Sequence, residues 1–159
     1  MNKLLIMAGL IVTTSVSAVP EELTFELNAK IPASRFYVVF QDPSFGSTVQ
    51  EMKFEQASER LESLSTNIRA RNTSGKVVAY LKEAPELTHQ VDDTKKIPLN
   101  ISIDNKTLSN VSSSAVEIIG ASESDEKVLP LVIQQGSTAT FTDSGDYSAQ
   151  VTLMFESVI

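Results

Sequence analysis

Cysteine is absent from this chain of 159 residues, and histidine occurs once, at His89. Without cysteine the chain forms no disulfide, no thiol nucleophile and no thiolate metal site. A single histidine also excludes metal clusters built from several imidazoles. The fold must therefore be held by apolar burial and backbone pairing, for which the hydrophobic content of 42% provides enough material.

Positive charge is scarce as well, because 13 Lys and Arg residues face 20 Asp and Glu residues, a formal net charge of −7. An acidic surface repels phosphate backbones and anionic lipids, so nucleic acid and anionic membranes are not expected partners. The apolar run Leu4–Val12 is too short for a membrane-spanning helix, which needs about 20 residues.

The N-terminus has the three parts of a secretion signal. Lys3 supplies the charged region, Leu4–Val12 the apolar region, and Val16-Ser17-Ala18 the small-residue cleavage site. The sequence therefore predicts a cleaved signal peptide over Met1–Ala18. Removing 18 of 159 residues leaves 141, the size of one domain, and the loss of Lys3 changes the formal charge from −7 to −8.

The mature chain contains a series of short β-branched and aromatic runs separated by turn residues, which predicts an all-β sandwich. The segment Val49–Leu64 fits either a short helix or a strand followed by a loop, and Gly120–Lys127 is expected to be a surface loop. A hairpin is expected where the turn Asn72-Thr-Ser-Gly75 joins two runs. The predicted strands are Glu22–Ile31, Arg35–Gln41, Leu64–Arg71, Lys76–Lys82, Pro98–Ile103, Ala115–Ile119, Val128–Ile133, Thr138–Phe141 and Asp146–Phe155.

Two of these segments carry apolar residues at every second position, which places those side chains on one face of a strand. In the N-terminal segment they are Leu23, Phe25, Leu27, Ala29 and Ile31; in the C-terminal segment they are Tyr147, Ala149, Val151, Leu153 and Phe155. A strongly patterned strand at a free terminus can leave its own domain, so the first segment is a candidate for strand exchange with a neighbouring subunit.

Candidate catalytic and metal-binding residues are few. A hydrolase triad would depend on His89, which lies in the predicted exposed loop Leu87–Asp93, and the chain has no Gly-x-Ser-x-Gly elbow. Asp92-Asp93 and the group Glu123, Asp125 and Glu126 lack the spacing of a calcium loop and are interpreted as solvated acidic loops. Asn72, Asn100, Asn105 and Asn110 lie in Asn-x-Ser/Thr triplets and are interpreted as turn and strand residues. No catalytic residue, metal site or cofactor is therefore expected.

The order of these features resembles the alpha-class fimbrial major pilins of the coli-surface-antigen and colonization-factor-antigen type. The resemblance spans nearly the whole mature chain and rests on the segments Val19–Ile31, Thr66–Leu81, Ala84–Thr88, Ile97–Ser102 and Gly145–Met154.

The resemblance implies an incomplete immunoglobulin-like β-sandwich that is completed by donor-strand exchange. Residues 19–31 would form the donor strand and residues 32–159 the sandwich domain. Leu23, Phe25, Leu27 and Ala29 would be the donor residues, and Tyr147, Ala149, Val151, Leu153 and Phe155 would form one wall of the acceptor groove.

The resemblance also implies the partners and the location. The partners would be identical or related pilin subunits, a periplasmic chaperone, an outer-membrane usher and a tip adhesin, with host glycans as further candidates. The protein would pass through the periplasm to a fimbria on the bacterial surface and support adhesion there.

Two alternatives stay open at this point. The first is a monomeric secreted β-sandwich that binds a ligand through loops such as Asp42–Thr48 or Gly120–Lys127. The second is a secreted hydrolase that uses His89. Stability as a monomer without the N-terminal strand would favour the first, and activity retained in His89→Ala, or no activity at all, would remove the second.

Export should cleave the chain after Ala18 and leave Val19 as the mature N-terminus, because small residues occupy both recognition positions before the cut. Mass spectrometry of the exported protein measures this directly. A retained signal, or a mature chain that starts at another residue, would contradict the prediction.

Overall fold

The computed structural model describes residues 25–31, 36–137 and 143–159. The predicted signal peptide, Leu23 and the predicted strand Thr138–Phe141 lie outside these residues. The chain divides into two units, Met1–Ile31 and Pro32–Ile159. In the first unit, residues 25–31 form no helix and no strand, and the side chains of Phe25 and Leu27 are 74% and 83% exposed.

The second unit is built from β-strands, and the described residues contain no α-helix. The segment Val49–Leu64, for which a helix was one expectation, instead holds two short strands and the start of a third. The strands are β1 (Phe36–Phe40), β2 (Phe54–Glu55), β3 (Arg60–Leu61), β4 (Leu64–Asn72), β5 (Lys76–Leu81), β6 (Glu86–His89), β7 (Lys96–Ile103), β8 (Lys106–Thr107), β9 (Val116–Ile119), β10 (Lys127–Gln135), β11 (Tyr147–Ser148) and β12 (Leu153–Val158). A 3-10 turn lies at Ser112–Ser114. Within the described residues, no helix is long and apolar enough to cross a membrane.

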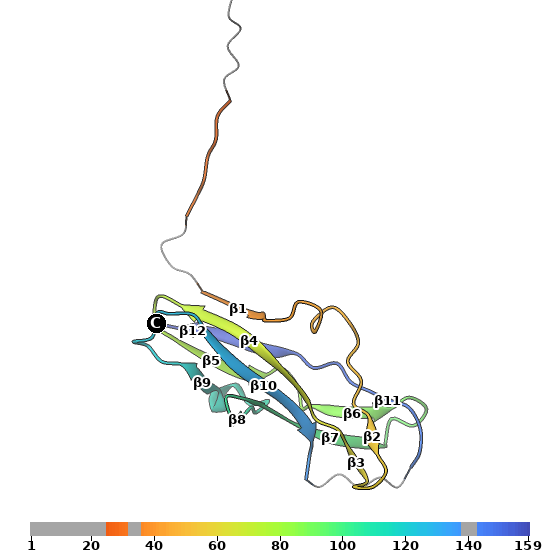
Figure 1. Ribbon diagram of the computed structural model, residues 1–159. Helices are drawn as coiled ribbons and strands as arrows, with labels where there is room; N and C mark the ends of the chain where they lie inside the picture. The colour runs from red at the N-terminus through yellow and green to blue at the C-terminus, as the bar shows by residue number, and fades with distance from the viewer. Residues whose placement is uncertain (1–24, 32–35, 138–142) are drawn as a thin grey trace, which may run out of the picture. The chain divides into compact units, whose positions relative to one another are not determined.

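The strands form two main antiparallel sheets, whose strands overlap in the view of Figure 1. The larger sheet has the order β1-β4-β10-β7-β6-β11, with β8 paired to β7, and the smaller sheet has the order β12-β5-β9. Strands β2 and β3 pair only with each other among the described elements. The result is a sandwich, as the sequence predicted.

The core lies between the two sheets and is made of side chains that alternate along the strands. In β5, for example, Val77, Ala79 and Leu81 are buried whereas the residues between them are partly exposed. Together with these three, the buried apolar cluster contains Ile68, Ala70, Ile101, Ile103, Leu108, Ile118, Ile119, Leu129 and Leu131.

The turn after Asn72 connects the two sheets rather than two paired strands. Because β4 belongs to the larger sheet and β5 to the smaller one, the predicted hairpin is wrong, although both strands and the turn are where the sequence placed them. Gly75 has a φ of 106°, and a Cβ atom there would lie 2.2 Å from the carbonyl oxygen of Val158. Glycine therefore allows the end of β12 to lie against this turn.

Asn72 fixes the same junction from inside. Its side chain is buried, and Nδ2 donates to Ser157 Oγ at 2.8 Å and to the carbonyl oxygen of Lys76 at 3.3 Å. Its Oδ1 accepts a hydrogen bond from the backbone N–H of Ser74 at 3.1 Å. One side chain thus joins the turn to the last strand.

On the outer face of the larger sheet, Glu126 joins three segments. Its carboxylate accepts hydrogen bonds from Arg69 Nε at 2.9 Å, from Arg69 Nη2 at 2.7 Å, and from the hydroxyl of Tyr37. These bonds, with that from Arg69 the strongest, lower the pKa of Glu126 to about 2. The loop that carries Glu126 forms no strand from Gly120 until β10 begins, as the sequence predicted.

The low pKa of Glu126 makes a prediction for stability at acid pH. An unfolded glutamate titrates near pH ~4.3, so the folded state gains stability from this carboxylate above that pH and loses it as the pH falls toward 2. The unfolding midpoint of Glu126→Gln should therefore lie below that of the wild type near neutral pH, and the two should converge at low pH. Glu83→Gln, at an exposed position, is the matched control. A difference that stays constant down to pH ~2 would argue against this role.

Asn72→Ala should lower the free energy of unfolding by about 1–3 kcal/mol, because it removes the hydrogen bonds that this buried amide makes to the turn and to Ser157. Ser157→Ala should cost less, about 0.5–1.5 kcal/mol, because it removes one of these bonds. Denaturant unfolding measures both values. Asn67→Ala, at an exposed position of β4, provides the control, and an equal loss in Asn67→Ala and Asn72→Ala would refute the assignment.

Candidate functional site

One side of the sandwich is open at the edges of both sheets. Among the described residues, β1 pairs only with β4, and β12 pairs only with β5. Both edge strands lie on the upper side of the molecule in Figure 1. Each edge strand has a row of backbone N–H and C=O groups on its outer side that can pair with a further strand.

The side chains beneath these edges are apolar and incompletely covered. Val38 and Phe40 of β1 pack against the buried cluster, as do Leu153 and Phe155 of β12 and Val151 just before it, yet all five are only partly buried. The apolar core therefore continues to the surface on the open side.

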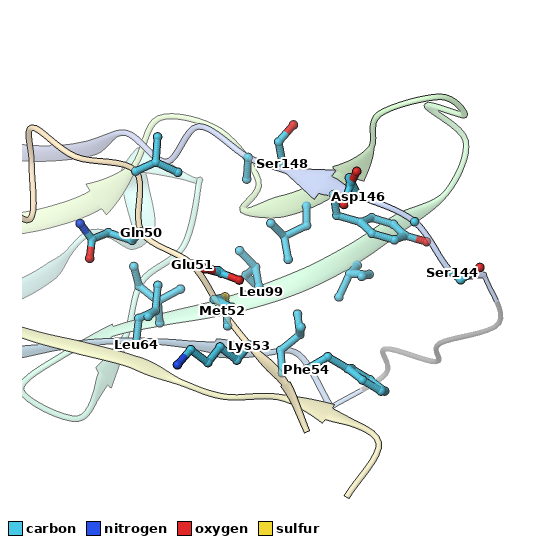
Figure 2. A pocket seen from close by; sticks show the side chains of 18 of the residues that line it. Gln50, Glu51, Met52, Lys53, Phe54, Leu64, Leu99, Ser144, Asp146 and Ser148 are labelled. Atoms are coloured by element: carbon cyan, nitrogen blue, oxygen red, sulfur yellow. The ribbon is translucent and has the colours of Figure 1, made fainter. Parts of the chain in front are cut away.

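Further along the same side the chain forms a groove with a volume of about 1110 Å³. One wall is residues 49–54, which follow β1 in the chain, and the other is residues 143–149, which precede β12. Figure 2 shows the two walls, with Met52 and Phe54 on one, Asp146 and Ser148 on the other, and Leu99 between them. The floor is apolar and consists of Leu64, Leu87, Ile97, Leu99 and Ile133.

The five residues predicted to form one groove wall do not share one strand: Tyr147 lies in β11, Leu153 and Phe155 lie in β12, and Ala149 and Val151 lie in the link between them. Tyr147 and Ala149 line the groove, whereas Val151, Leu153 and Phe155 border the open side of the core. The expectation of one continuous strand over Asp146–Phe155 is wrong, because β11 pairs with β6 of the larger sheet and β12 pairs with β5 of the smaller one. Apolar residues continue at every second position of the sequence while the chain passes from one sheet to the other.

The predicted donor residues lie in the N-terminal unit. Leu23 is outside the described residues, and Phe25, Leu27 and Ala29 are all exposed there. The polar side chains of Glu26 and Asn28 between them hydrogen-bond to each other, with Nδ2 of Asn28 donating to Oε1 of Glu26 at 3.2 Å.

Sequence reasoning missed the wall at residues 49–54 and the floor of the groove. Most floor residues occur in strands that the sequence did identify, and their alternation shows that one face is buried. Two floor residues are exceptions. Ile97 lies one residue before the predicted strand Pro98–Ile103, and Leu87 lies in β6, which overlaps a segment that was expected to be an exposed loop. Alternation identifies the buried face of each strand but not the order of the strands in the sheet. The strand order decides which of these faces lies under the open side.

The acidic and histidine candidates have local structural partners. His89 is the last residue of β6, half-buried, and its Nδ1 accepts backbone N–H bonds from Val91 at 3.2 Å and from Asp92 at 3.0 Å. A hydrogen bond from the Thr94 side chain lowers the pKa of Asp92, and one from Lys127 lowers the pKa of Glu123. In the described ranges, no group of three or more His, Cys, Asp or Glu side chains is arranged to hold a metal ion.

Comparisons with known proteins agree with this geometry. Eight chains of solved structures match, among them the CooA pilin subunit from enterotoxigenic Escherichia coli. The match to CooA has a TM-score of 0.54 and 19% sequence identity, and covers 66% of this chain and 75% of that one. It confirms the predicted fold class, an immunoglobulin-like all-β sandwich of the pilin kind. A search of curated proteins found no match.

The comparison with protein families covers nearly the whole chain. The profile of the CS1 type fimbrial major subunit matches residues 21–156. A match of that extent shows the family and places the protein in a fimbria at the bacterial surface, as a structural subunit. The chain belongs to the CS1 type fimbrial major subunit family.

Proposed function

We propose that this subunit polymerises by donor-strand complementation, in which the N-terminal segment of one copy fills the open side of the next. Leu23, Phe25, Leu27 and Ala29 are the donor residues. The acceptor is the open side of the sandwich, where Leu153 and Phe155 border the core and Tyr147 and Ala149 line the groove. The mature chain then consists of a donor segment, residues 19–31, and a sandwich, residues 32–159.

One observation carries this proposal: the chain has both an uncovered apolar groove and an uncovered alternating apolar segment. Phe25, Leu27 and Ile31 are 74%, 83% and 76% exposed, although their spacing suits a strand with one buried face. The groove has a volume of about 1110 Å³ and an apolar floor, which suits the alternate apolar side chains of an extended segment.

An inserted strand would satisfy both needs of the open side. Its backbone would pair with the free edge of β12 or β1, and its alternate side chains would fill the apolar trough below. Burial of Leu23, Phe25 and Leu27 at about 1.5–3 kcal/mol each contributes roughly 5–9 kcal/mol before the costs of ordering the segment. Repeated head to tail, such a contact does not close on itself and builds a filament.

The same groove explains the assembly partners that we propose. An uncovered apolar trough next to free strand edges promotes aggregation, so a periplasmic chaperone would cover it until an outer-membrane usher exchanges the chaperone for the next subunit. A tip adhesin would end the fibre, and host glycans are candidate ligands of the assembled surface. The role of this chain is structural rather than catalytic.

The donor assignment predicts that Phe25→Asp separates folding from assembly. The variant should still form a chaperone complex, because its own sandwich is unchanged. It should fail to enter fibres, because a carboxylate is not desolvated in an apolar groove. Co-expression with the chaperone, followed by separate assays of chaperone complex and surface fibres, measures both outcomes.

Asn28→Asp is the matched control, since it adds the same charge to the polar face of the same segment and should leave fibre yield unchanged. Normal fibre yield from Phe25→Asp, or loss of its chaperone complex, would falsify the donor assignment. A chain without residues 19–31 that is a stable, soluble monomer in the absence of a chaperone would instead favour a monomeric ligand-binding module.

A further inference from the structure

The groove wall formed by residues 143–149 has little backbone pairing of its own. Strand β11 has two residues, Tyr147 and Ser148, which pair with His89 and Thr88 of β6. Isolated pairing of this length gives little stability. Other contacts must therefore hold this wall beside the groove.

Three contacts from the region of β6 and the turn after it supply that support. The backbone N–H of Gln90 donates to the carbonyl oxygen of Asp146 at 2.9 Å. Lys95 Nζ lies 2.8 Å from the carboxylate of Asp143. The ring of His89 meets the ring of Tyr147 edge-to-face, with centroids 4.9 Å apart and planes at 76°.

The wall also passes directly over the imidazole of His89. A Cβ atom at Gly145 would lie 2.1 Å from His89 Nε2, and this glycine has a φ of 151°. The position of the His89 ring therefore sets the path of the backbone at Gly145, which itself lines the groove.

The ring is held in place through its other nitrogen. Nδ1 accepts the backbone N–H groups of Val91 and Asp92, so the neutral ring has its proton on Nε2. An imidazolium has no acceptor nitrogen, and a proton on Nδ1 removes both bonds. Protonation is thus incompatible with the observed turn and with the ring position that the turn fixes.

Charged residues of both signs lie in the segments next to His89. They are Asp92 and Asp93 of the turn, Asp143 and Asp146 of the wall, and Lys95 and Lys96. The Tyr147 hydroxyl donates a hydrogen bond to the carbonyl oxygen of Asp143 at 3.2 Å. Asp92 also interacts electrostatically with His89. The carboxylate of Asp92 accepts a hydrogen bond from the backbone N–H of Thr94 and lies 3.7 Å from Lys95 Nζ.

We propose that His89 is a positioning residue that keeps the 143–149 wall shaped to accept a strand, and that protonation of His89 releases this wall. The proposal rests on the donor-strand function above and adds a control of the acceptor site by pH. Histidine is the type of side chain whose charge ordinarily changes between about pH 5 and 8, and His89 is the only histidine of the chain. A preformed groove binds a strand at lower cost than one that must be ordered first.

The test uses the full-length subunit in its chaperone complex and a synthetic peptide of residues 19–31 as the donor. The rate of peptide uptake is measured near pH 7.5 and near pH 5.5, the two sides of the ordinary histidine titration. At the higher pH, His89→Ala should take up the peptide about tenfold more slowly than the wild type, as expected from the loss of two hydrogen bonds. His89→Gln, which keeps an acceptor oxygen, should restore most of the rate.

The comparison of the two pH values separates a positioning role of His89 from a general structural effect of its substitution. Acidification should slow the wild type several-fold more than His89→Gln, which does not titrate. Because every variant is bound to the same chaperone, the pH response of the chaperone cancels in this comparison. Asn100→Ala, an exposed change on β7, should behave like the wild type.

A second measurement tests the role of His89 without relying on the uptake of a donor strand. Hydrogen exchange of residues 143–149, measured in the chaperone complex at a single pH, should be faster in His89→Ala than in the wild type or in Asn100→Ala. Equal exchange, or peptide uptake by His89→Ala at the wild-type rate at both pH values, would overturn the positioning role. If the wild type takes up no peptide, the donor-strand function and the pH control of uptake both fail, and hydrogen exchange alone then decides whether His89 holds the wall.

Discussion

The rest of this structure depends on one constraint: among the described residues, no strand pairs with the outer edge of β1 or of β12. Each of these strands is paired on one side only within the described part of the chain, and the apolar side chains beneath them pack on the core without being fully covered. A chain without cysteine has no covalent means to close this side. The missing backbone pairing and the missing apolar cover are needed at the same place, so one extended segment satisfies both.

The apolar core is most completely buried away from the open side of the sandwich. Ile68, Ile103 and Ile119 are 1% exposed or less, and they come from both sheets. The junction of Asn72 with Ser157 then fixes the far end of β12, and Glu126 joins β1 to β4 through Tyr37 and Arg69. Side chains therefore hold both edge strands in position, and the open side keeps its shape although a strand is missing between its two edges.

Most strands could be predicted from the sequence because alternation and turn residues are local signals. Alternation identified β4, β5 and β7, whose buried faces form much of the core. Sheet membership could not be predicted in the same way. The pattern from Tyr147 to Phe155 is uninterrupted, yet its two ends pair with strands of different sheets. The partner of Glu126 is 57 residues away in the chain, at Arg69, so no local pattern pointed to it.

The two parts of the open side are held by different kinds of interaction, and this difference bears on how an incoming strand is accepted. Beside the core, β12 pairs with β5 over six residues, and a backbone ladder of that length resists deformation. Beside the groove, the wall pairs over two residues and otherwise depends on side chains, among them His89 and Lys95. Side-chain contacts adjust or break one at a time, whereas a ladder yields as a unit. If a strand is inserted here as proposed, the β12 edge would offer a rigid backbone ladder, whereas the shape of the wall of residues 143–149 would depend on the side chains that hold it, His89 among them.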